Sequence, residues 1–97
     1  MSLHLTWVET KRQTNLRKHG LDFADAGVVL ESRYRLDVEQ SRHGELRMQS
    51  FAYVMQRFAV LTVVQADRAD TIRVISFRFG SEQESEHFYA WIGKETD

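Results

Sequence analysis

The hydrophobic positions in the first third of the chain predict one short strand and two helices. Residues 3–8 alternate between apolar and polar side chains well enough for a strand. A helix should start at Glu9 or Thr10 and end near His19, because Gly20 follows where glycine favours a left-handed backbone. Asp22 is a plausible N-cap for a second short helix through Leu30. The short connection between the helices predicts a tight corner.

The rest of the chain has a two-residue period until its last segment. Tyr34, Leu36 and Val38 alternate with polar residues, and a polar stretch around residues 41–44 predicts a turn. Residues 47–54, 58–65 and 71–79 then predict three consecutive strands, rich in β-branched and aromatic side chains. Their short polar connections suit antiparallel hairpins.

The last segment predicts a helix. Ser81 and Glu84 have the spacing of a capping box, and Phe88, Tyr89 and Trp91 follow. The element order is therefore β-α-α-β-β-β-β-α. This order predicts an α+β fold in which helices pack on one side of an antiparallel sheet of four to five strands. With 97 residues, no proline and scattered glycines, the chain should form a single domain over residues 1–97.

The composition excludes several kinds of site but does not identify one. The chain has no cysteine, which excludes disulfides, thiolate metal sites and a cysteine nucleophile. Its four histidines are scattered, so we expect no metal and no cofactor. There is neither a signal peptide pattern nor an apolar run that could cross a bilayer, so a cytoplasmic location with no membrane partner is expected.

Net charge is -1, yet the positive charges are unevenly distributed. Residues 11–18 hold four basic side chains and no acidic one. At helical spacing Lys11, Asn15, Lys18 and His19 share one broad stripe. The stripe is either a solvated face that ends in a basic cluster favoured by the helix dipole, or one wall of an anion site.

Two arginines interrupt the otherwise apolar strand of residues 71–79. Arg73 and Arg78 are an odd number of positions apart, so one must lie at an edge, at the strand end or beyond a bulge. Each needs an anionic partner, either an internal carboxylate such as Glu45 or Glu84, or a phosphate. Glu45 and Arg47 should share a face, as an ion pair or as part of an acid–base site.

Two runs of the chain are specific when taken together: Asn15-Leu16-Arg17-Lys18-His19-Gly20, and Thr71-Ile72-Arg73-Val74-Ile75-Ser76 with Arg78. Less specific positions are Trp7, Lys11, Phe23, Ala26, Gly44-Glu45, Arg47, Glu84, Glu86 and Tyr89. Together, over nearly the whole chain, they resemble the BrnT toxin family. The resemblance implies a RelE-like fold and a metal-independent ribonuclease that inhibits translation as the toxin of a bacterial type II toxin–antitoxin system. It also implies a BrnA-like ribbon-helix-helix antitoxin as partner, with DNA contacted only through that antitoxin.

RNA cleavage by attack of the 2′-hydroxyl needs proton transfer and stabilisation of a more negative phosphorane. The candidate catalytic residues are Lys11, Lys18, His19, Glu45, Arg73 and Arg78, and the candidate RNA contacts are Trp7, Asn15, Arg47 and Ser76. His19 or Glu45 could be the general base or acid, although Glu45 would need a raised pKa. The hypothesis requires the cationic groups to converge around one cavity. Trp7 could stack on an unpaired base, and the alternative is that its side chain is buried in the core.

The chain departs from the family pattern at Val8, Phe79, Glu82 and Gln83, and the last three changes remove positive charge. A catalytically degenerate homologue that binds antitoxin or RNA is therefore the main alternative. A nucleic-acid-binding module without a toxin role is another, and it predicts a steep loss of affinity with salt. For the antitoxin contact, Phe88 and Trp91 are candidates, with ordinary core packing as the favoured reading.

Overall fold

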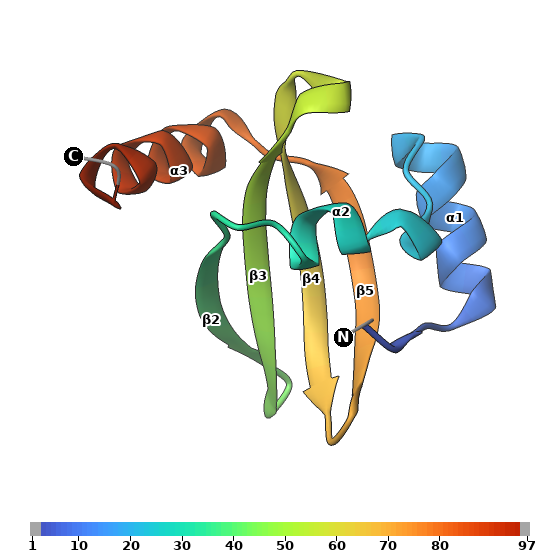
Figure 1. The fold of residues 1–97 in the computed structure, drawn as a ribbon. Coiled ribbons are helices and arrows are strands. Elements are labelled where there is room, and N and C mark those ends of the chain that lie inside the picture. The colour runs from blue at the N-terminus through green and yellow to red at the C-terminus, as the bar shows by residue number, and fades with distance from the viewer. Residues whose placement is uncertain (1–2, 96–97) are drawn as a thin grey trace.

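The computed structural model describes residues 3–95 and gives the predicted order of elements (Figure 1). In chain order they are β1 (Leu5–Thr6), α1 (Glu9–His19), the 3-10 helix η1 (Phe23–Asp25), α2 (Gly27–Leu30), β2 (Leu36–Arg42), β3 (Glu45–Val54), the 3-10 helix η2 (Met55–Arg57), β4 (Ala59–Arg68), β5 (Thr71–Phe79) and α3 (Glu82–Glu95). The fold is α+β, as predicted. Within this range no helix is long and apolar enough to span a membrane.

The five strands form one sheet in the order β1-β5-β4-β3-β2. The strands from β2 to β5 pair antiparallel, but β1 pairs parallel to β5, with Leu5 opposite Ile72. The prediction of a wholly antiparallel sheet is therefore wrong at this edge. The first strand is also shorter than the predicted residues 3–8, because the carbonyl of Val8 already accepts N–H bonds from the start of α1.

Local turn chemistry follows the sequence closely. His43 and Gly44 join β2 to β3, and both have a left-handed backbone, with φ values of 53° for His43 and 76° for Gly44. Two consecutive left-handed residues give the hairpin turn whose twist matches the flanking strands. The predicted capping box is present, since the Glu84 carboxylate accepts from the Ser81 N–H at 2.8 Å and the Ser81 hydroxyl accepts from the Glu84 N–H at 3.1 Å.

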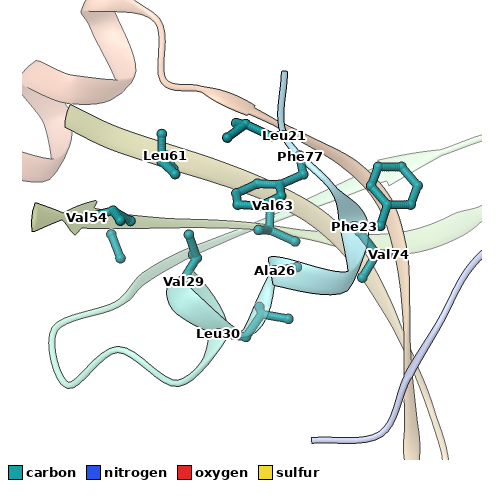
Figure 2. Close-up of a cluster of buried hydrophobic side chains, with 11 residues drawn as sticks. Leu21, Phe23, Ala26, Val29, Leu30, Val54, Leu61, Val63, Val74 and Phe77 are labelled. Atoms are coloured by element: carbon teal, nitrogen blue, oxygen red, sulfur yellow. The ribbon is translucent and has the colours of Figure 1, made fainter. Parts of the chain in front are cut away.

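The core is split between the two faces of the sheet. On one face α2 crosses the central strands (Figure 1), and the larger cluster there contains Leu21, Phe23, Ala26, Val29, Leu30, Ala52, Val54, Leu61, Val63, Val74 and Phe77 (Figure 2). The second cluster, beneath α3, consists of Phe51, Val60 and Phe88 with partly buried Leu36, Val38, Trp91 and Ile92. Phe88 is only 1% exposed, so it is a core residue and not an antitoxin contact. Helices therefore cover both faces, whereas the sequence predicted one.

Candidate functional site

A β-bulge brings Arg73 and Arg78 to the same face of the sheet. Arg73 lies opposite Ala66 and Arg78 opposite Thr62, and these partners are four residues apart on β4. Between them the register shifts, because Val74 pairs with Gln65 and Ser76 with Val64, which leaves Ile75 as the extra residue. Ser76 consequently lies between the two arginines on the face that also carries α3.

Helix α1 lies along the outer edge of β5, and Asn15 fixes it there. The Asn15 amide donates to the carbonyls of Phe77 at 2.7 Å and Leu21 at 3.0 Å, and its oxygen accepts the Phe77 N–H at 3.2 Å. The side chain is buried. Asn15 was predicted to contact RNA, but these bonds occupy its amide and give it a positioning role.

The space between α1 and β5 is a groove of about 380 Å³, lined by Thr10, Lys11, Thr14, Asn15, Lys18, His19, Ile75 and Ser76. The predicted basic stripe thus forms one wall, and the bulge of β5 forms the other. Along the edge of β5, β1 pairs with Ile72 and Arg73, and Asn15 bonds to the backbone of Phe77. The groove lies between these two points of contact. Of the cationic groups that the hypothesis requires around one cavity, Lys11, Lys18 and His19 line this groove, whereas Arg73 and Arg78 do not.

His19 is the titratable group of the groove with the most altered environment. Burial lowers the pKa of His19, and the positive charges of Lys18 and Arg78 lower it further. The imidazole is therefore mainly neutral at pH 7 and can accept a proton. Of these charges, that of Lys18 has the larger effect, and Arg78 does not line the groove.

Arg78 is paired with the carboxylate of Glu84, one of the two internal partners that the sequence suggested. The bonds are 2.7 Å to Oε1 and 2.9 Å to Oε2. Glu84 also accepts from Thr62 at 3.2 Å. The Arg78 guanidinium and these further donors lower the pKa of Glu84 to about 2 despite its partial burial. This network ties the start of α3 to β5.

Arg73 is paired with Glu45, the other suggested partner. Its Nη2 lies 2.9 Å from Oε1 and 2.8 Å from Oε2 of that carboxylate. Arg47 on β3 donates to the same carboxylate at 3.1 Å, as does Arg68 at the end of β4 at 3.1 Å. Bonding to Arg47 and the charges of Arg73 and Arg47 lower the pKa of Glu45, which is opposite to the change that acid–base catalysis near neutrality needs.

The sequence missed Arg68, Thr10 and Thr14 as members of these sites. Arg68 stands in a polar hairpin where a charged residue is ordinary. Its position in the fold is what could have indicated Arg68 as a partner of Glu45, because the end of β4 lies beside the start of β3 in an antiparallel pair. Trp7 is partly buried against the core, and its indole N–H donates to Glu9 at 3.1 Å, so its packing is closer to the buried alternative than to a free stacking surface.

A family model for the ribonuclease toxin BrnT of type II toxin–antitoxin systems matches residues 7–84. The chain belongs to the BrnT family. The match includes both walls of the groove, from Lys11 to His19 on α1 and Ile75 and Ser76 on β5, as well as the arginines beside it. Among curated proteins, no significant match is found.

Three of the positions at which this chain departs from the family pattern, Phe79, Glu82 and Gln83, lie at the end of β5 and the start of α3. Glu82 and Gln83 are exposed in the first turn of α3, where an acidic residue is favoured by the helix dipole. Phe79, at the end of β5, is 44% exposed. Among residues 3–95, no three His, Asp or Glu side chains group as a metal site would require.

Proposed function

We propose that this BrnT-family toxin is a metal-independent endoribonuclease that cleaves RNA in the groove between α1 and β5. The observation that supports this most directly is the meeting of two ammonium groups, Lys11 and Lys18, with a histidine whose pKa is lowered, His19. A neutral imidazole beside fixed positive charge suits deprotonation of a ribose hydroxyl next to a phosphate.

In the proposed reaction His19 takes the proton of the 2′-hydroxyl, and the 2′-oxygen attacks the adjacent phosphorus. The bond from phosphorus to the 5′-oxygen breaks, which gives a 2′,3′-cyclic phosphate, and Lys11 or Lys18 protonates the leaving oxygen. Positive charge from the lysines and from Arg78 stabilises the phosphorane, an effect of roughly 2–4 kcal/mol per well-placed donor. Ser76 lines the groove and is a candidate RNA contact.

In this proposal Glu45 is not an acid–base catalyst. Its lowered pKa keeps it ionised, and its contacts are with Arg47, Arg68 and Arg73. Arg47 remains a proposed RNA contact on the sheet face beside the groove, and we give Arg73, a candidate catalytic residue from the sequence, the same role. The biological setting that we propose is RelE-like: cytoplasmic RNA cleavage that arrests translation, held in check by a BrnA-like ribbon-helix-helix antitoxin.

The test is initial-rate cleavage of a single-stranded RNA by the purified chain in EDTA. We expect cleavage to persist in EDTA, and to stop when the riboses at the cleaved positions are replaced by 2′-deoxyribose, because the attacking hydroxyl is then absent. Arg73→Ala should lower the rate. Loss of all cleavage in EDTA that returns with Mg²⁺ would contradict the metal-independent mechanism.

A second candidate function is RNA or antitoxin binding without cleavage. The observation that favours it is that both strand arginines are already paired with carboxylates, Arg73 with Glu45 and Arg78 with Glu84. If this reading holds, the pure chain binds RNA or the antitoxin but gives no cleavage product under any metal condition.

A further inference from the structure

One carboxylate, that of Glu45, is shared by three arginines from three strands. Arg47 is on β3, Arg68 ends β4 and Arg73 is on β5, and each forms an ion pair with Glu45 at 2.8–3.1 Å. We call these four residues the arginine cluster. In the part of the chain that the structure describes, the three arginines form no other ion pair, so two of their positive charges have no carboxylate partner.

The other paired arginines of the chain differ in this respect. Arg12 contacts two carboxylates, those of Glu9 and Asp22, and Arg35 and Arg78 have one each. Among the ion-pair groups of residues 3–95, the arginine cluster is thus the one in which cations outnumber anions. Because a guanidinium has five N–H donors and Glu45 takes only one nitrogen from each, many donors remain for another anion.

The cluster is also accessible. The exposed fractions of the side chains are 54% for Arg68, 31% for Glu45, 30% for Arg73 and 19% for Arg47. Beneath them lies Ala66, which is opposite Arg73 on β4 and only 3% exposed. A small side chain on this central strand leaves room for Arg73 to reach across to Glu45 on β3. The result is a positively charged surface open to solvent.

The position of the cluster relates it to the groove. Arg73 and Ser76 share a face of β5, and because Ile75 is bulged they are effectively two strand positions apart, which is roughly 6.6 Å. Ser76 lines the groove. An extended anionic chain bound at the groove would therefore meet Arg73 next, and then the rest of the cluster.

We infer that the arginine cluster is a phosphate-binding subsite for the RNA strand flanking the scissile bond, and that Glu45 occupies it until an RNA phosphate displaces it. The inference rests on the proposed function for the identity of the ligand. A phosphodiester, like the carboxylate that it replaces, has two anionic oxygens that can accept a pair of N–H bonds from a guanidinium. Glu45 keeps the arginines ordered in the free protein and competes with RNA.

The test measures binding of a fluorescent single-stranded oligonucleotide with 2′-O-methyl riboses, which cannot be cleaved by 2′-hydroxyl attack. Glu45→Gln removes the competing charge and should tighten binding by about 3- to 10-fold at low salt, with a steeper dependence of log Kd on log salt. Arg68→Gln should weaken binding by about 3- to 10-fold and flatten that dependence. Arg33→Gln is the matched control, since Arg33 stacks on Tyr34 at 5.4 Å and is not in the cluster.

Circular dichroism establishes that each variant is folded at the temperature of the measurement. Since Arg68 is largely exposed, its substitution keeps the test decisive even if Glu45→Gln does not fold. Unchanged binding in both variants, or weaker binding of folded Glu45→Gln, would overturn the subsite. Cleavage of ordinary RNA by the unsubstituted chain is measured in parallel. If it cleaves while the variants bind normally, only the subsite fails; if it never cleaves, the proposed function fails whatever the variants bind.

Discussion

The side chain of Asn15 on α1 takes the place of a neighbouring strand at Phe77 on β5. Its side-chain amide both donates to and accepts from the backbone of Phe77, at 2.7 Å and 3.2 Å, as a neighbouring strand would. A helix is thereby fixed to a sheet edge through a buried polar contact. The groove depends on this contact, because its two walls are α1 and β5.

The first prediction concerns the stability that Asn15 provides. Asn15→Ala removes three hydrogen bonds and leaves the Phe77 backbone groups unpaired in a buried place. We expect the free energy of unfolding to fall by about 2–4 kcal/mol, measured by urea denaturation. Gln13→Ala is the control on the same helix, because Gln13 is exposed and bonds only to Glu9; its effect should stay within about 0.5 kcal/mol. Equal stability of the two variants would refute this role of Asn15.

Much of the fold could be predicted because the signals are local. The β-branched and aromatic residues of positions 71–79 predict the observed bounds of β5, and Gly20 ends α1 with a φ of 71°, as glycine at that position predicts. The parallel pairing of β1 could not be predicted in this way. It joins Leu5–Thr6 to Ile72 and Arg73, and two paired residues so far apart in sequence leave no periodic signal.

The sequence predicted part of the geometry around the strand arginines, Arg73 and Arg78. Their odd spacing left an edge, the strand end or a bulge as possible explanations, and the structure has the bulge, at Ile75. The sequence offered Glu45 and Glu84 as partners without deciding between them. Which arginine pairs with which carboxylate depends on which strands are neighbours. For Arg78 the partner is Glu84, because the capping box of α3 places Glu84 beside the end of β5.

The second prediction is the loss of cleavage when the proposed base is removed. His19→Ala should lower kcat/KM for RNA by about 10²- to 10⁴-fold, the usual contribution of a positioned general base. His87→Ala is the control, because His87 is exposed on α3. The unsubstituted chain should gain activity as pH rises through the lowered pKa of His19, so its acid limb should lie below pH 6.5. Equal rates for both histidine variants would remove His19 from the mechanism.

The third prediction concerns the charges that act on His19. Burial is the largest cause of its lowered pKa, and the charge of Lys18 is the next. Lys18→Gln removes that repulsion of the imidazolium, so the pKa of His19 should rise, which NMR titration of the imidazole protons can measure. Lys94→Gln makes the same change in net charge on the last turn of α3 and should leave this titration unchanged. A rise of similar size in both variants would indicate a general charge effect instead of a local one.

The last prediction follows from the network around Glu84, whose pKa is lowered from 4.5 to about 2. A carboxylate with a lowered pKa in the folded state contributes stability that is present above its ordinary pKa and is lost as pH falls through about 2. Glu84→Gln should cost about 1–3 kcal/mol at pH 7, since it leaves the Arg78 guanidinium without its counter-charge. The variant should also lose less stability than the unsubstituted chain when the pH is lowered from 5 to 2, measured by thermal unfolding. Glu86→Gln, at an exposed position of the same helix, should match the unsubstituted chain throughout. If Glu84→Gln kept the full acid sensitivity, the ion pair with Arg78 would not be what holds α3 to β5.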